Sequence, residues 1–526
     1  MTQVNDQTYE VSNTSESISE APPSLARILF KGSSALGLAT LLERGLGFLA
    51  NLAAARLGGT HIFGAYSLAI STANNVASYA GAGIGTTANR FSGEYPFGGP
   101  GYRGFLRTLA SVSLASAALA AAILWLAAKP IAVYLVRNPG LTQLLRLAAL
   151  SAGAIILLEC LRGLLIGQRR FAALLTLSAL FGGGLILVLP IAARQGPNGM
   201  VIGQATVAMS AIVICILAAK ALRFAPPPSL GAEVEGPRPA KIVRFGAVQL
   251  AGTIGLNAAG WWIASMVARA DASLEQAAWY AVAMQLRNIC AMPPWLISQT
   301  AYAQLTEDGG RNFGGAARVT VLSTLVATAV SLMICGPAAA LMPWIVPHLF
   351  GKAFAGAAFA ATLAAATGLI HMSAAPAAAR LTVVSLPLTG IINGAWTVLL
   401  IALGTWMIPK GGAAAGAAAG FLVAHLFAAA AVLVALVHFN SGTRQLVFCT
   451  IPAFIGSLSL GILAWLRVSD DAHKTALSLG MLAVTAVLLC IAFQQARNLS
   501  PALRELRLSQ LTSDWLARGA CLARRA

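Results

Sequence analysis

The chain has 526 residues, of which 58% are hydrophobic and only 10% are charged, and its formal net charge is +18. A soluble globular protein usually carries about 25% charged residues, so this composition cannot cover a water-exposed surface. The excess of Lys and Arg does not indicate a nucleic-acid partner, because these residues are scattered singly over loops rather than gathered in one patch. Composition therefore predicts an integral membrane protein.

Long apolar runs recur along the chain from Ser33 to residue 494. A run of about 18 or more apolar residues can cross a bilayer as a helix, whereas the alternating strands of a membrane β-barrel are absent. We therefore expect an all-α membrane protein with about fourteen transmembrane helices. The expected spans are 33–55, 63–88, 108–128, 143–165, 172–192, 200–220, 244–268, 277–302, 318–341, 356–379, 386–407, 413–437, 448–466 and 475–494.

The distribution of basic residues predicts the orientation. With the N-terminus in the cytoplasm, most loop arginines, including Arg169 and Arg170, and all those of the C-terminal tail lie on the inner side. Cytoplasmic loops of membrane proteins are enriched in Lys and Arg. Both termini are therefore predicted to be cytoplasmic.

Composition also divides the chain into segments. The N-terminal segment is polar and acidic and lacks the basic residues of a signal peptide, and Pro226-Pro227-Pro228 is typical of a linker. The C-terminal segment interleaves Leu and Trp with Arg, as membrane-surface helices do. The expected segments are a disordered tail at 1–24, an N-lobe of six spans at 25–220, a linker at 221–241, a C-lobe of six spans at 242–437, an extra span pair at 438–494, and a cytoplasmic amphipathic tail at 495–526.

The two lobes resemble repeats of each other. A shift of 213 or 214 residues superposes identical residues, and six spans separate the paired helices, which preserves their orientation. The superposed pairs are Thr40 and Thr253, Gly47 and Gly260, Arg56 and Arg269, Tyr66 and Tyr280, Ala69 and Ala283, and Asn74 and Asn288. The pattern predicts two parallel, pseudo-symmetric bundles with a substrate site between them.

A polar stripe on the first span marks that site. Polar residues and glycines recur every three or four positions from Ser33 to Asn51, which places them on one helix face. Arg44 lies near the middle of this span. A central Arg costs about 2.5–3.5 kcal/mol on membrane-insertion scales, so this face is expected to line a polar cavity. Glu43 is adjacent in sequence but does not face Arg44, so it requires another partner or a proton. A structural ion pair between helices is the alternative role for both.

Further polar residues extend the candidate site. Glu159 and Arg162 are spaced to pair on one helix face, and His371 and His425 are either packing residues or proton relays. The cysteines form no CxxC motif, and no catalytic triad, metal cluster or phosphate loop is visible, so no catalytic residue, metal or cofactor is expected. The predicted substrate-binding residues are Arg44, Asn51, Asn74, Asn257, Arg287 and Asn288, and the predicted coupling residues are Glu43 and Glu159.

Short motifs between the first two spans carry a family resemblance. The stretches 54–59 (AARLGG) and 63–69 (FGAYSLA), together with 81–90 and 163–171, resemble the Wzx-type polysaccharide exporters of the multidrug/oligosaccharidyl-lipid/polysaccharide (MOP) superfamily. The turn Gly59-Thr60-His61-Ile62 departs from the Pro or acidic residue that is more frequent there.

The resemblance implies a flippase rather than an enzyme. It would move an undecaprenyl-pyrophosphate-linked oligosaccharide across the bacterial inner membrane by alternating access, for O-antigen, capsule or exopolysaccharide synthesis. It further implies contact with membrane lipids, a coupling cation (H⁺ or Na⁺), and a polysaccharide polymerase or chain-length regulator as possible partners.

Three alternatives stay open. A lipid II flippase would belong to the same superfamily. A cation-coupled drug antiporter would favour buried carboxylates, whereas this chain favours buried arginines. A membrane polymerase or glycosyltransferase usually displays large outer loops, and all the outer loops predicted here are short.

Overall fold

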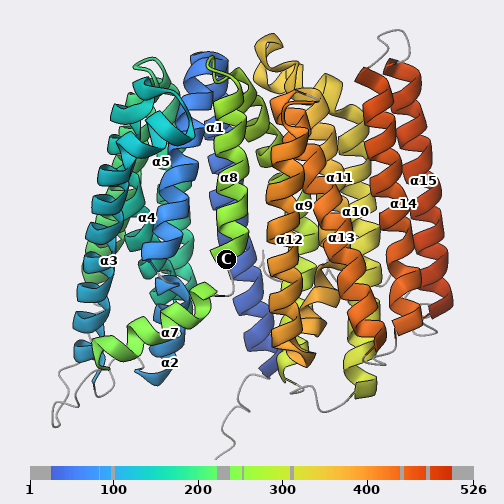
Figure 1. Ribbon diagram of the computed structural model, residues 1–526. Coiled ribbons are helices and arrows are strands. Elements are labelled where there is room, and N and C mark those ends of the chain that lie inside the picture. The colour runs from blue at the N-terminus through green and yellow to red at the C-terminus, as the bar shows by residue number, and fades with distance from the viewer. Residues whose placement is uncertain are drawn as a thin grey trace, which may run out of the picture.

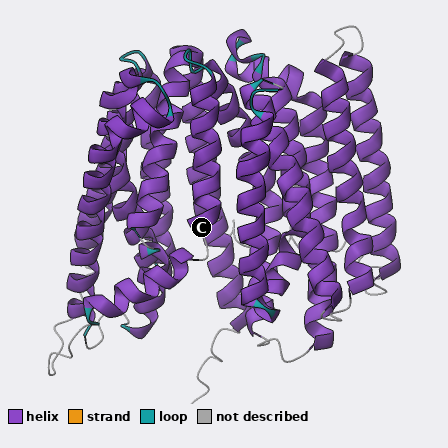
Figure 2. Ribbon diagram, in the orientation of Figure 1, coloured by secondary structure: helices purple, strands orange, loops and turns teal. Residues whose placement is uncertain are grey.

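A computed structural model describes residues 25–81, 83–95, 101–221, 237–251, 254–307, 313–410, 412–438, 443–468 and 474–499. Within these ranges all regular secondary structure is helical, as Figure 2 shows. The prediction of an all-α fold is confirmed.

The first bundle consists of six helices. They are α1 (Leu25–Ala80), α2 (Ile84–Glu94), α3 (Tyr102–Pro130), which continues as η1 (Ile131–Leu135), α4 (Thr142–Gly167), which follows η2 (Pro139–Leu141), α5 (Phe171–Ala193) and α6 (Pro197–Ala221). These helices pack mainly on one another, and α4 contacts α1, α2, α3 and α6.

The second half begins with α7 (Pro239–Ala251), and the second bundle extends from α8 to α13. Its helices are α8 (Ile254–Ala270), α9 (Glu275–Glu307), α10 (Phe313–Phe350), followed by η3 (Lys352–Phe354), α11 (Ala357–Val384), α12 (Leu386–Met407) and α13 (Ala413–His438). The last two helices, α14 (Thr443–Val468) and α15 (Lys474–Leu499), pack on α10 and α11 at the outer edge of this bundle (Figure 1).

The first two predicted spans are the two parts of α1, which is broken at Gly59, inside the predicted gap between them. Gly59 interrupts the helical geometry of α1 with φ 74° and ψ −179°, a conformation that only glycine adopts without strain. The second span, predicted at 63–88, is too long: α1 ends at Ala80, and α2 begins at Ile84 after Gly83, whose φ is also positive. The hydrophobic pattern continues through this break, which explains the error.

The seventh span also differs from its prediction. The expected helix at 244–268 is divided into α7 and α8, so Gln249 lies on a different helix from Asn257 and Gly260. In Figure 1, α7 lies across the end of α2, at a steep angle to α8. Arg90 and Lys241 make cation–π contacts to Phe245 and Phe91 there, and Lys241 pairs with Glu94. The charges of α7 favour this surface position over the bilayer core.

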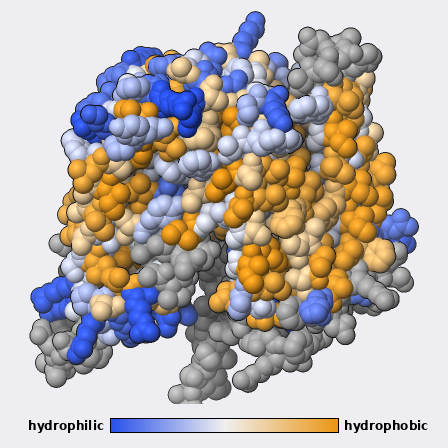
Figure 3. All heavy atoms as spheres, viewed as in Figure 1, coloured by the Kyte–Doolittle hydropathy of each residue, from blue (hydrophilic) through white to orange (hydrophobic). Residues whose placement is uncertain are grey.

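Among the described residues, eleven helical stretches are long and apolar enough to cross a membrane. The broken helix α1 counts once in that number, and neither α8, with 17 residues, nor α9 is among the eleven. The exact number of fourteen spans therefore stays a prediction. On the face shown in Figure 3, hydrophobic residues gather over the middle of both sides of the molecule and hydrophilic residues lie toward its two ends, as expected for a protein embedded in a bilayer.

The predicted segment boundaries are only partly inside the described ranges. The tail at 1–24 and residues 500–526 of the C-terminal tail lie outside them. The same is true of residues 222–236 of the linker, whereas α7 already begins at Pro239, within the predicted linker.

Candidate functional site

A central cavity of about 690 Å³ lies between the two bundles. Helices α1, α5, α6 and α9 line it. Four of the six predicted substrate-binding residues meet here, namely Arg44, Asn51, Asn74 and Asn288, together with Glu43. The polar stripe on the first span therefore faces a cavity, as its spacing predicted.

Arg44 is the cation of this central cavity. Its guanidinium carbon is 5.4 Å from the ring centroid of Trp295 on α9, within cation–π range. Its neighbour Glu43 is bound to another arginine, and Arg44 forms no ion pair with any described carboxylate. Its charge is therefore accessible to an anionic ligand in the cavity.

Several oxygen atoms in the same wall have no hydrogen-bond partner among the described residues. They are Asn51 Oδ1, Ser67 Oγ and Gln285 Oε1, all buried and all on residues that line the central cavity. Tyr66 and Gln204, by contrast, bond to each other across α1 and α6 at 2.5 Å. Because a buried oxygen without a partner is costly, these groups suit a ligand that carries hydroxyl groups.

Glu43 and Glu159 share one arginine. Arg162 on α4 forms an ion pair with Glu159 on the same helix and with Glu43 on α1, 119 residues away in sequence. The predicted pairing of Glu159 with Arg162 is thus present, and the missing partner of Glu43 is Arg162. One guanidinium with two carboxylates leaves the cluster one negative charge in excess when both are ionised.

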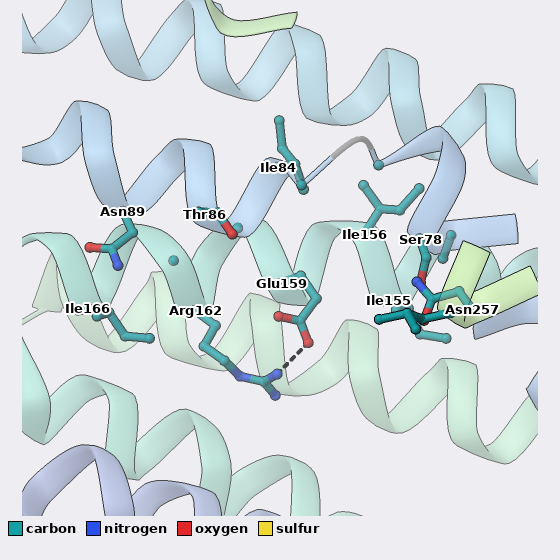
Figure 4. Close-up of a pocket in the computed structure, with 16 residues that line it drawn as sticks. Ser78, Ile84, Thr86, Asn89, Ile155, Ile156, Glu159, Arg162, Ile166 and Asn257 are labelled. Atoms are coloured by element: carbon teal, nitrogen blue, oxygen red, sulfur yellow. Dashed lines mark hydrogen bonds and ion pairs between the residues drawn. The ribbon is translucent and has the colours of Figure 1, made fainter. Parts of the chain in front are cut away.

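A second cavity, which we call the N-lobe cavity, has a volume of about 510 Å³ on the other side of this cluster. Figure 4 shows Glu159 and Arg162 joined by their ion pair among the residues that line it, with Asn89 on one side and Ser78 and Asn257 on the other. Asn257 was predicted to share a cavity with Arg44. It lies instead in the wall of the N-lobe cavity, with Glu159 and Arg162, whereas Glu43 and Arg44 line the central cavity.

Arg287 lines a third space, the C-lobe cavity, of about 420 Å³ within the second bundle. His371 and His425 lie on the same wall, and Arg287 Nη2 is 2.9 Å from His371 Nδ1. A smaller cavity of about 290 Å³, the connecting cavity, is bordered by Arg287 and Asn288. Asn288 also lines the central cavity, whereas Arg287 does not. Arg287 therefore borders the neighbouring connecting cavity instead of the central cavity.

The two bundles are in close contact at one end of the molecule. A Cβ atom on Gly64 of α1 would lie 2.2 Å from the carbonyl oxygen of Leu274, so only glycine permits this approach. Nearby, Arg56 donates a hydrogen bond to the carbonyl oxygen of His348 at 2.9 Å, and Thr60 Oγ1 is 3.4 Å from Glu275 Oε1. These contacts close the interface around the break in α1 at Gly59, where the sequence predicted an outward-facing loop.

The predicted binding residues do not include all of the polar wall. Gln285, three residues before Asn288 on α9, and Gln204 on α6 both line the central cavity. Gln285 carries the same signal as Arg287 and Asn288, a polar residue within the eighth predicted span, whereas Gln204 was not singled out. No group of three or more His, Cys, Asp or Glu side chains that could hold a metal occurs among the described residues.

No protein-family model and no curated protein matches the sequence. Solved structures do match the fold. The lipid II flippase MurJ in an inward closed conformation superposes with a TM-score of 0.64 at 13% identity, over 88% of this chain and 98% of that chain. A multidrug-resistance MATE transporter of the MOP superfamily, in an inward-facing conformation, gives 0.57 at 15% identity over 79% and 98%.

A further MATE structure, in a bent conformation, gives a TM-score of 0.55 at 15% identity over 82% of this chain and 100% of that chain. At these identities the likeness concerns the fold. The superposition includes both bundles of this chain, because nearly the whole length of each matched chain is aligned. The chain is therefore a multi-span membrane protein with the fold of the MOP transporters.

Proposed function

We propose that this chain is a flippase that moves a lipid-linked oligosaccharide across the bacterial inner membrane by alternating access, for surface polysaccharide assembly. The observation that carries the proposal is the central cavity, in which Arg44 lies among uncommitted amide and hydroxyl oxygens. A guanidinium binds phosphate oxygens in a defined geometry, and the oxygens suit sugar hydroxyls. The substrate is thus an undecaprenyl-pyrophosphate-linked sugar.

The roles of the predicted residues follow from their places. Arg44 binds the diphosphate, with Arg287 as a second cation, while Asn51, Asn74 and Asn288 contact the sugar. Glu43 and Glu159 couple transport to a cation, H⁺ or Na⁺. Their shared guanidinium leaves carboxylate oxygens for that cation at the boundary between the central and N-lobe cavities.

Export in a strain that lacks other flippases tests the proposal. We expect Arg44→Ala to abolish export at normal protein abundance, and Arg44→Lys to retain part of it, because lysine keeps the charge but loses the planar fork. Arg146→Ala is a matched control, since Arg146 lies over Trp125 outside the central cavity. Normal export by Arg44→Ala would refute the proposal; if that variant is degraded, Arg44→Gln replaces it.

Lipid II is the alternative substrate. It is favoured by the fold match to a lipid II flippase, which covers more of this chain than the MATE matches above do. Depletion of the native lipid II flippase in a host that expresses this chain separates the two. Survival of the host would assign lipid II, whereas lysis with intact polysaccharide export would assign the oligosaccharide.

A further inference from the structure

Three basic side chains from three helices meet in the C-lobe cavity. Arg287 on α9 directs Nη2 toward His371 Nδ1 on α11, at 2.9 Å, and toward His425 Nε2 on α13, at 3.5 Å. The two imidazole rings are 4.8 Å apart between centroids. None of the residues that line this cavity is acidic. The cluster is therefore an accumulation of basic groups without a carboxylate to balance it.

The contacts define the protonation state of both histidines. A guanidinium has only N–H donors, so each imidazole nitrogen that faces Arg287 must carry a lone pair. The other nitrogen of His425, Nδ1, is 2.8 Å from the carbonyl oxygen of Phe421 and donates to it. Both rings are thus neutral acceptors. A proton on either nitrogen that faces Arg287 would break its contact and repel the guanidinium.

Arg287 has a second space to enter. It borders the connecting cavity as well as the C-lobe cavity, beside Ser67, Ser71 and Asn288, which also line the central cavity. Its Nε atom is buried and has no hydrogen-bond partner among the described residues. A guanidinium released by the histidines would lie next to an anion bound at the boundary of the central cavity.

The other helices around the cluster add few titratable groups. Tyr280 and Cys290 of α9 and Cys335 of α10 are the titratable neighbours of the cluster among the described residues. From α12 the cavity receives the uncharged side chains of Asn393 and Trp396, and α8 and α14 add no charged group to its lining. Among these groups, histidine is the side-chain type whose unperturbed charge change lies between about pH 5 and pH 8.

We propose that Arg287, His371 and His425 form a proton-linked anion site: an oxyanion of the phosphate type takes the N–H groups of Arg287, and the released imidazoles accept protons from water in the cavity. Anion and protons then bind together, and each raises the affinity for the other. The inference rests on the proposed function only where it takes the substrate diphosphate as the anion. It places a proton-coupling element in the second bundle, away from Glu43 and Glu159.

Sulfate binding to the purified full chain in phosphatidylcholine nanodiscs tests the site, because the charge of sulfate is constant between about pH 5.5 and about pH 8. Calorimetry in two buffers of different ionisation enthalpy counts the protons taken up. We expect proton uptake on binding and a fall in affinity of about tenfold per pH unit for each linked proton. Binding without proton uptake, or no binding, would overturn the proposal.

Variants locate the effect. His371→Gln with His425→Gln should still bind sulfate through Arg287 but without proton uptake, and Arg287→Gln should lose the proton-linked binding. His61→Gln, an exposed histidine on α1, is the control and should match the parent. Persistent proton uptake in the double variant would overturn the assignment even if Arg287→Gln fails to fold.

Two competitors distinguish the sources of the anion. Displacement of sulfate by farnesyl diphosphate would identify a lipid headgroup, whereas displacement by inorganic pyrophosphate alone would identify a free ion. Sulfate binding is measured on the purified protein without transport, so its outcome does not depend on the outcome of the Arg44 export experiment. If sulfate binding shows no proton link while Arg44→Ala abolishes export, the proposed function stands and this inference does not.

Discussion

At the scale of single residues, the strongest constraint in the membrane interior is the ion cluster of Glu43, Glu159 and Arg162. Both carboxylates depend on one guanidinium, and the side chains of Arg162 and Glu43 are only 21% and 20% exposed. Removal of the shared cation leaves two carboxylates close together in a poorly solvated place. The cluster therefore connects α1 to α4, with Glu43 in the wall of the central cavity and Glu159 and Arg162 in the wall of the N-lobe cavity.

We expect Arg162→Gln to destabilise the protein by about 1–3 kcal/mol, the cost of leaving partly buried polar groups unpaired. Thermal unfolding in detergent measures this change. Glu43→Gln in the Arg162→Gln background should recover part of the loss, because it removes one of the two repelling charges. An unchanged unfolding temperature in Arg162→Gln would show that the ion pairs contribute nothing to stability.

Asp271, in the turn between α8 and α9, gives a pH-dependent prediction. Burial alone would raise its pKa, but hydrogen bonds donated by Gln276 and Ser273 outweigh burial and lower the pKa below the ordinary 3.8. The Asp271 carboxylate therefore binds a proton more readily in the unfolded chain than in the folded one. Its contribution to the free energy of unfolding is complete above pH 3.8 and is lost as the pH falls through the lowered pKa.

Unfolding temperatures of the parent and of Asp271→Asn, recorded from neutral to acidic pH, isolate that contribution. The difference between the two proteins should be largest near neutral pH and should shrink in acid, since the asparagine amide carries no titrating charge. A difference that is constant with pH would contradict the assigned role of the carboxylate.

At the scale of helices, the sequence predicted the positions of most spans because each is a long apolar run. It failed where a break lies inside such a run, at the α1–α2 boundary and between α7 and α8. The break at Gly59, by contrast, falls in the predicted gap between the first two spans. The sequence did not predict which side chains pair across helices. Arg162 bonds to Glu43, 119 positions away, and Arg287 bonds to His425, 138 positions away. Such contacts depend on which helix faces pack together, which a single sequence does not encode locally.

The contact of α1 with the start of α9 offers a test at this scale. Gly64→Ala would place a methyl group 2.2 Å from Leu274 O, so the two helices must separate. We expect maleimide to label a cysteine at Thr60 faster in this variant, in a background without Cys490 and Cys521, since Thr60 is 8% exposed here. Gly45→Ala is the control, because no atom lies within 4 Å of its added methyl. Equal labelling rates in the two variants would refute the inferred separation.

At the scale of the whole molecule, a dense contact between the two bundles lies around the break in α1 at Gly59. Phe48 and Phe63 of α1 contact Phe350 and Phe354 there, at centroid distances of 6.0 and 6.1 Å. The Arg56 and Thr60 bonds lie in the same region. For a transporter of this fold, alternating access requires these contacts to break in each cycle, because the central cavity must open to the other side of the membrane.

Cross-linking across this closure tests whether it opens. Cysteines at Thr60 and Glu275, whose side-chain oxygens are 3.4 Å apart, can be joined by a short thiol-specific linker in the background without Cys490 and Cys521. We expect the linked protein to lose export and a cleavable disulfide-containing linker to restore it after reduction, while each single-cysteine variant treated with the same reagent keeps export. Full export by the linked protein would mean that the bundles need not separate at this end. The substrate would then pass by another route, and the central cavity could not serve as an alternating-access site.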